Sequence, residues 1–258
     1  MPKLFSRRVF LWAGAQTAAL MGLPLGTAAA SSGGSGAPRW GLVVDMRRFA
    51  EPECATRAAQ ACHAAHNVPV IPHTAEPNGP DQGLSWMRVM PLSRVFPGPE
   101  APHLPEDLRQ KLKTTGFPAL CNHCDNPPCV RVCPTGATFT CADGTVAQDP
   151  HRCIGCRYCM AACPYGARSF NFRDPAPFVA SPNPDYPLRQ RGMVEKCTFC
   201  PERIAKGLEP YCVAAVPEAL IFGDLREPHS PPRQVLTHRA AWRRKARLGT
   251  EPAVYYVF

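Results

Sequence analysis

The chain has 258 residues, enough for one large domain or two small ones, with 14 cysteines, 31 prolines and a formal net charge of +9. Its proline content is about twice the usual ~5%, which excludes a fold made mainly of long helices or wide sheets, because proline removes a backbone donor. So many cysteines indicate that disulfides or metal ligands supplement the hydrophobic core.

Residues 1–30 are typical of an export signal. The first eight residues are basic, an apolar run extends to about Leu25, and small side chains follow at 27–30. Residues 6–11, which include Arg7 and Arg8, resemble the twin-arginine signal. That resemblance implies a periplasmic protein exported after folding, with its cofactors already inserted. The alternative is an uncleaved membrane anchor, although polar residues and glycines make this run only weakly apolar.

Short elements separated by long proline-rich loops are expected along the rest of the chain. Residues 31–38 form a Gly/Ser-rich flexible leader. The sequence predicts strands at residues 40–45, 85–90 and 221–222, proline-rich passages at 71–105 and 174–187, cysteine-rich regions at 117–172 and 196–212, and a basic helix at 237–248. We expect Gly249 to end that helix as a C-cap glycine.

The most regular cysteine run has the spacing C-x2-C-x2-C-x3-C and is followed by Pro164. It contains Cys153, Cys156, Cys159 and Cys163. In bacterial ferredoxins three thiolates of such a run hold one 4Fe–4S cluster, and the fourth holds a neighbouring cluster. Zinc sites instead pair two C-x2-C arms across a dozen or more residues, so the spacing favours iron–sulfur.

A second run has two extra residues before its third cysteine but ends in the same Cys-Pro. It contains Cys121, Cys124, Cys129 and Cys133. If the two runs exchange their fourth cysteines, one cluster is held by Cys121, Cys124, Cys129 and Cys163. The other cluster is then held by Cys153, Cys156, Cys159 and Cys133. The sequence thus predicts a complete two-cluster unit.

The outer cysteines give one complete ligand set and one that is absent. Exchange between the outer segments assigns one cluster to Cys197, Cys200, Cys212 and Cys62. The neighbouring cluster would need thiolates at positions that carry Phe49, Ala55, Ala58 and Val216. One cluster is therefore deleted entirely, and we expect three 4Fe–4S clusters on twelve cysteines. We expect protein packing around Phe49 and Val216 to replace the lost cluster, at one end of the original row of four.

Two cysteines, Cys54 and Cys141, remain outside these sets. Free thiols are the simpler interpretation, and a disulfide between them is the alternative in an oxidising compartment.

Other chemistries fit the sequence less well. Covalent haem needs C-x-x-C-H, but Ala59 stands where Cys62-His63 would require a first cysteine. His123 mimics half of a Rieske site that has no second arm, and is expected to be a loop residue near the cluster. His63 and His66 are expected to have structural or capping roles, with contact to an electron-transfer partner as the alternative. No phosphate-binding or hydrolytic motif is present, so we expect no reaction of its own.

The basic residues 239–247 fit a solvated helix face, with an acidic partner or anionic lipid as the alternative. Nucleic acid is not expected as a partner of an exported protein.

Residues 153–168 and 249–256 carry the strongest family resemblance. They resemble the four-cluster ferredoxin subunits that transfer electrons in polysulfide, tetrathionate and dimethyl sulfoxide reductases. Residues 61–69, with the twin-arginine signal, are similar to DsrO-type subunits, the periplasmic iron–sulfur subunits of the transmembrane complex associated with dissimilatory sulfite reductase. The resemblance implies a quinone-interacting membrane partner of the polysulfide-reductase type and a periplasmic cytochrome subunit. The first of the family's four clusters is not implied here, because its ligand positions are lost.

We therefore predict an α+β fold of two ferredoxin-like modules related by a pseudo-repeat. Residues 116–187 form the inner module with two clusters, and residues 39–115 and 188–226 form the outer module with one. Residues 227–258 form a C-terminal basic helix and tail. The predicted function is electron transfer in a respiratory or sulfur-metabolism complex. The alternatives are a subunit of a periplasmic molybdenum reductase and a structural subunit whose clusters only brace the fold.

Overall fold

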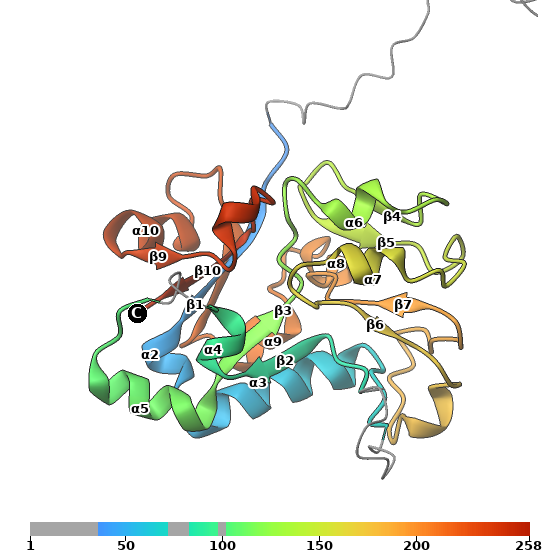
Figure 1. The fold of residues 1–258 in the computed structure, drawn as a ribbon, viewed down its shortest axis with the longest axis horizontal. Coiled ribbons are helices and arrows are strands. Elements are labelled where there is room, and N and C mark those ends of the chain that lie inside the picture. The colour runs from blue at the N-terminus through green and yellow to red at the C-terminus, as the bar shows by residue number, and fades with distance from the viewer. Residues whose placement is uncertain (1–35, 72–82, 98–101) are drawn as a thin grey trace, which may run out of the picture. The chain divides into compact units, whose positions relative to one another are not determined.

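A four-stranded sheet joins distant parts of the sequence (Figure 1). The computed structural model describes residues 36–71, 83–97 and 102–258, so the predicted export signal lies outside the described residues. β1 (Trp40–Asp45) pairs antiparallel with β8 (Leu220–Asp224) and parallel with β10 (Val254–Val257). β9 (Ala241–Trp242) pairs antiparallel with β10 and forms the other edge. β1 is buried along nearly its whole length, which explains its continuous apolar run.

The longest helix, α3 (Pro52–Ala65), begins with a proline at its first position, where the missing N–H needs no partner. Its buried side chains recur every three or four residues and are mostly small: Cys54, Ala55, Ala58, Cys62 and Ala65. Small side chains on one face allow close packing, and α3 packs there against α9 (Tyr211–Ala215).

Further elements close the core around this sheet. The connecting elements of the first half are α2 (Met46–Phe49), β2 (Met87–Met90), α4 (Leu92–Val95), α5 (Glu106–Thr115) and β3 (Phe117–Leu120). β2 and β3 pair antiparallel. The Tyr256 ring of β10 lies 5.3 Å from the Phe96 ring, and its hydroxyl donates to the Pro118 carbonyl at 2.7 Å. The C-terminal strand is thus fixed inside the core.

A second, smaller region contains short helices and two-stranded ladders. Its elements are α6 (Pro128–Arg131), β4 (Thr138–Thr140), β5 (Val146–Gln148), α7 (Tyr158–Ala162), β6 (Ser169–Phe170), the 3-10 helix η2 (Ala176–Phe178) and β7 (Val194–Glu195). β4 pairs with β5, β6 pairs with β7, and α6 packs against α7. The described chain is completed by α8 (Pro201–Ile204), α10 (Pro231–His238) and the 3-10 helix η3 (Ala246–Leu248).

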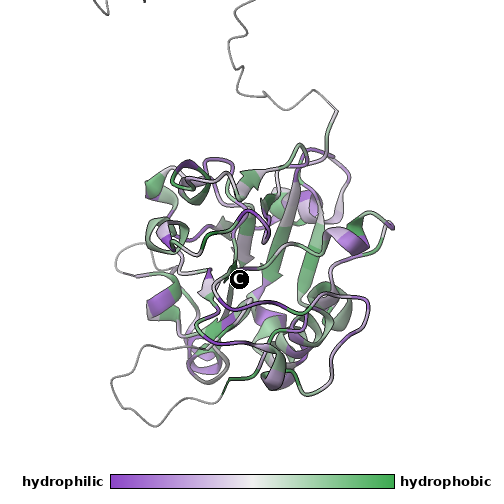
Figure 2. Cartoon of the chain, turned by 90° about the vertical axis from the view of Figure 1, so that its right-hand side faces the viewer, coloured by the Kyte–Doolittle hydropathy of each residue, from purple (hydrophilic) through white to green (hydrophobic). Residues whose placement is uncertain are grey.

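Helices and strands are mixed throughout, as expected of an α+β protein, and the predicted strands at 40–45, 85–90 and 221–222 correspond to β1, β2 and β8. Strands coloured as hydrophobic lie inside, while hydrophilic segments concentrate at the periphery (Figure 2).

The predicted helix at residues 237–248 is wrong. α10 ends at His238, Trp242 pairs with Tyr256 in the sheet, and Arg244 is buried. These tertiary contacts override the helical propensity of the basic segment. Gly249, at φ +62°, does cap a helix as predicted, but the helix is η3.

Candidate iron–sulfur sites

Four buried thiols from the outer cysteine segments line one cavity, which we call site C: Cys62, Cys197, Cys200 and Cys212. Cys62 comes from α3 and Cys212 from α9, so the packing of these helices brings the two thiols together. Cys200 has a left-handed backbone (φ +54°) that turns the loop into α8. Apolar side chains such as Leu42 and Phe222 complete the wall. The structure thus gathers the predicted outer ligand set.

The thiols of site C are poorly suited to exist as free thiolates. Burial, followed by the neighbouring cysteines, raises the pKa of Cys197 to about 12. Burial likewise raises the pKa of Cys200 and Cys212 to about 12 and that of Cys62 well above 9.0. Backbone N–H groups of Phe199, Tyr211 and Val213 point at these sulfurs and act in the opposite direction. A four-thiolate donor set with N–H···S bonds fits a 4Fe–4S cluster, whose iron stabilises the thiolates.

His66, at the end of α3, also lines site C. Its Nδ1 donates to the Cys62 carbonyl at 2.7 Å, and its Nε2 lies 3.2 Å from Glu202 Oε1. Its ring stacks on Trp86 at 4.6 Å. His66, Cys200 and Glu202 also place ligand atoms within 4.8 Å of one another, as a single metal ion would require. We assign Cys200 to the four-thiol set, because it also lines that cavity.

A second cavity, site A, is lined by four cysteines from the two inner runs: Cys121, Cys124, Cys129 and Cys163. These are the residues that the predicted exchange assigns to one cluster. Burial raises the pKa of Cys124 to about 12 and also raises that of Cys163. The C-terminal segment supports this site, because the Ala253 N–H donates to the Asn122 carbonyl at 2.8 Å. The four-thiol set again fits a 4Fe–4S cluster.

The remaining predicted ligand set, Cys133, Cys153, Cys156 and Cys159, lies nearer the surface, and we call it site B. Cys159 is buried and packs with Cys129 and Cys153 in a small hydrophobic cluster, whereas Cys156 is exposed. The Thr138 N–H donates to Cys133 Sγ at 3.4 Å. Burial raises the pKa of the Cys133 thiol, but N–H and hydroxyl donors of Thr138 and Thr135 outweigh burial and lower the pKa overall.

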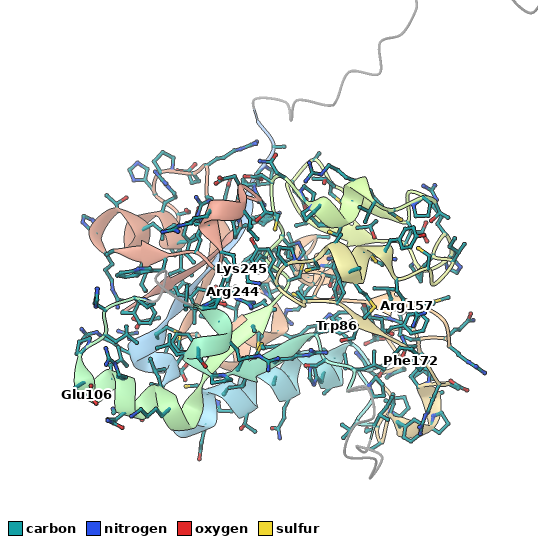
Figure 3. The ribbon with its side chains drawn as sticks, viewed as in Figure 1. Trp86, Glu106, Arg157, Phe172, Arg244 and Lys245 are labelled. Carbon is teal, nitrogen blue, oxygen red and sulfur yellow. The ribbon has the colours of Figure 1, made fainter. Side chains whose placement is uncertain are left out.

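Exposed apolar side chains surround site B. They are Val132, Phe139, Ile154, Tyr158 and Phe172. Ile154 and Tyr158, with 67% and 63% of their surface accessible, flank Cys153 and Cys159 in sequence. The Arg157 guanidinium lies 5.5 Å from the Phe172 ring, and both side chains lie on the same side of the molecule (Figure 3). Site B therefore opens onto an apolar surface that carries an arginine.

Contacts between the sites define their order. Cys121 of site A shares the main core with Cys197 of site C, and the charge of Cys121 raises the pKa of Cys197. Cys129 of site A packs instead with Cys159 of site B. Site A thus contacts both of the other sites.

The positions predicted to have lost a cluster are packed into the main core. Phe49, Ala55, Ala58 and Val216 are all buried there, and Phe49, Ala58 and Val216 have no accessible surface. They lie on α2, on α3 and at the end of α9, beside Cys62 and Cys212.

Of the two cysteines outside the predicted sets, Cys54 is buried and Cys141 is half-buried. Cys54 is buried near Arg48 and Glu218, and burial, followed by the Glu218 charge, raises its pKa.

His123 lies in the loop after Cys121, as predicted, and stacks on Phe199 at 3.8 Å. Its Nδ1 accepts from the Val146 N–H at 3.1 Å, so the proton of the neutral ring is on Nε2. His63 and His66 lie at the end of α3, where His66 is the C-cap residue.

Lys196 and Arg168 were not recognised from the sequence as site residues. Both are buried beside the thiols. In the sequence, only their closeness to predicted ligands could have indicated a role at the sites: Lys196 directly precedes Cys197, and Arg168 follows Cys163 by five residues.

The sequence is similar to those of known iron–sulfur proteins. Residues 112–175, which hold every cysteine of sites A and B, match the model of a 4Fe-4S dicluster domain. The Hdr-like menaquinol oxidoreductase iron–sulfur subunit 1 of Archaeoglobus fulgidus is 40% identical, over 84% of this chain and 82% of that protein. The iron–sulfur cluster-binding subunit of the Nitratidesulfovibrio vulgaris menaquinone reductase is 34% identical, over 85% of this chain and 88% of that protein. The Escherichia coli protein NrfC is 34% identical, over 98% and 95%.

The chain belongs to this family of iron–sulfur electron-transfer subunits. Its relatives cover nearly the whole described chain, so the assignment does not rest on the cysteine runs alone. None of the helices in the described residues is long and apolar enough to cross a membrane.

Proposed function

We propose that this subunit transfers electrons through three 4Fe–4S clusters, held at sites C, A and B in that order. The observation that carries the proposal is that two cavities are each lined by four cysteines from different segments, with site A in contact with both neighbours. When bound, a 4Fe–4S cluster supplies a one-electron redox centre. An electron that enters at one end leaves at the other, so the subunit undergoes no net oxidation.

The protein contributes thiolates, N–H donors and exclusion of water. Site C lies within the main core, so its surroundings exclude water most completely. The N–H groups directed at Cys197, Cys200 and Cys212 stabilise negative charge on sulfur. We infer that the subunit catalyses no substrate reaction of its own, since the thiol sets are complete.

The lost cluster is inferred to have been the terminal one, next to site C. The buried residues Phe49, Ala58 and Val216 lie on or beside the elements that also carry Cys62 and Cys212. Loss at an end shortens the row without interrupting it. We likewise propose the two-module organisation, with residues 116–187 as the inner ferredoxin-like module and residues 39–115 and 188–226 as the outer one.

Site B is the proposed point of exchange with a partner, because Cys156 is exposed among apolar side chains. Relatives are named for menaquinol oxidoreductase, menaquinone reductase and polysulfide reductase. We infer a quinone-interacting membrane subunit of the polysulfide-reductase type and a periplasmic cytochrome subunit as partners. The predicted twin-arginine signal supports a periplasmic location, with the subunit held at the membrane by its partners.

A periplasmic molybdenum reductase is the second candidate complex. A tetrathionate reductase subunit of Salmonella typhimurium is 43% identical, over 57% of this chain and 54% of that protein. Co-purification distinguishes the candidates, since a molybdenum subunit accompanies the chain only in the second.

Iron and acid-labile sulfide, measured on mature protein prepared without oxygen, test the proposal. Three clusters predict about twelve of each per chain. About eight would show that Cys62 does not complete site C, and about sixteen would show that Cys54 or a non-cysteine ligand restores the lost cluster. Clusters that a quinol and the membrane partner together cannot reduce would favour a purely structural role.

A further inference from the structure

Three basic side chains, Lys196, Arg168 and Arg244, are buried without a carboxylate partner among the described residues. Other buried charges in this part of the chain are paired: Arg239 with Asp45, Arg189 with Glu195, and Arg39 with Asp125. A buried charge without a counter-charge costs several kcal/mol in a protein interior. Negative charge is therefore expected close to these three cations, and the thiol sites are beside them.

Lys196 lies between sites C and A. Only 1% of its surface is accessible. Its Nζ donates to the Cys197 carbonyl at 2.8 Å and to the Val146 carbonyl. Cys197 lines site C and Val146 lines site A, so the ammonium group lies where the two sites meet.

Arg168 holds the equivalent place between sites A and B, with 4% of its surface accessible. It lines the cavity of site A, and its Nη1 donates to Gln148 Oε1 at 2.9 Å and to Thr138 Oγ1 at 3.2 Å. The Thr138 N–H in turn donates to Cys133 of site B. Nη2 of Arg168 has no nitrogen or oxygen partner among the described residues. The guanidinium instead directs donors at the sulfurs of Cys129 and Cys159.

The electrostatics agree with this placement. Burial lowers the pKa of the Arg168 guanidinium, but the negative charges of Cys129 and Cys159, one from each site, outweigh burial and raise the pKa overall. Burial and Cys121 raise the pKa of Cys197, and Lys196 opposes them.

We propose that Lys196 and Arg168 are fixed cations at the two junctions of the row, each setting the electron affinity of the sites on both sides of it. The proposal rests on the proposed row of sites C, A and B. A cluster on four thiolates carries net negative charge that increases on reduction, so a nearby cation favours the reduced form. A cation between two sites also weakens the repulsion between electrons on them. Arg244, 5.5 Å from the Tyr165 ring beside site A, lies at neither junction.

Potentiometric titration of each cluster, followed by electron paramagnetic resonance on the full chain, tests this inference. Arg168→Met is expected to weaken electron binding at sites A and B about tenfold. This lowers the reduction potentials of those two clusters by about 59 mV, the tenfold equivalent for a one-electron couple, and leaves the potential of site C unchanged. Lys196→Met is expected to do the same at sites C and A and to leave site B unchanged. Arg168→Lys and Lys196→Arg retain the charge and should restore most of each shift. Arg233→Met, which removes an exposed charge of α10, is the matched control and should shift none.

Equal shifts at all three clusters, or no shift in either variant, would overturn the inference. If a methionine variant contains fewer than about twelve irons per chain, Arg168→Gln and Lys196→Gln supply the same test, because they keep a donor without the charge. A wild-type protein with fewer than three reducible clusters would instead refute the proposed function. Three reducible clusters with unmoved potentials would refute only the role of the two cations.

Discussion

Sites C and B use the same kind of ligand in opposite surroundings. All four thiols of site C are buried, and the site lies in the main core between α3 and α9. Site B has one exposed thiol, two that are half-buried, and exposed apolar side chains around it. We therefore expect site C to contribute to the stability of the fold, and site B, the proposed point of exchange, to contribute to electron transfer with a partner. Substitutions at the two sites should therefore separate stability from electron transfer.

The largest expected contrast is between Cys212→Ala and Cys156→Ala. Each should lower the iron content by up to about four atoms, because each removes a ligand from one cluster. Cys212→Ala should also lower the free energy of unfolding by about 3–5 kcal/mol, since an emptied site in the main core leaves a cavity. Cys156→Ala should lower it by less than about 1 kcal/mol, as is usual for an exposed position. Chemical unfolding and iron analysis of both variants measure this, and an equal loss of stability would contradict the comparison.

A loss of stability without a loss of iron is expected at Phe49, which is packed where a fourth cluster is proposed to have been lost. Phe49→Ala should cost about 3–5 kcal/mol of unfolding free energy, as for other buried aromatic side chains. The iron content should stay at about twelve, because no ligand is removed. A thermal or chemical unfolding curve and an iron assay decide this. A variant that loses iron but not stability would show that the segment around Phe49 takes part in cluster binding.

The smallest effect is expected on the exposed surface of site B. Ile154→Ala should change the free energy of unfolding by less than about 0.5 kcal/mol, since two thirds of its side chain is already in contact with water. Leu220→Ala, at a buried position of β8, is the matched control and should cost about 2–5 kcal/mol. Equilibrium unfolding in urea measures both, and a large loss with Ile154→Ala would mean that this surface is part of the core.

Cysteine spacing predicted which thiols gather at sites A and C because cluster binding restricts local spacing strongly. Spacing also predicted that Val216 and the early alanines occupy lost ligand positions, and the structure packs these residues in the core. It carried no information on what surrounds the sulfurs. The aromatic contact between His66 and Trp86 joins two separate segments, and no sequence motif predicts that these two segments meet.

The C-terminal region shows the limit of local patterns most clearly. Residues 237–248 have a helix-forming composition, yet Trp242 joins the sheet and Arg244 turns inward. Both positions depend on partners that are distant in the sequence. Trp242 pairs with Tyr256, and Arg244 donates to the Tyr165 carbonyl. Likewise, neither Lys196 nor Arg168 differs in sequence from an ordinary surface cation. Only the burial of both at the junctions between sites sets them apart.

The parallel pairing of β1 with β10 has a consequence for the order of assembly during synthesis. Leu42 pairs with Val254, so the central sheet, and with it the enclosure of site C, cannot be completed until that late segment has left the ribosome. The cysteines of sites A and B are all translated well before it and lie close together in the sequence. Because the Ala253 N–H also donates to the Asn122 carbonyl beside site A, we expect sites A and C both to be completed only after this segment has been synthesised.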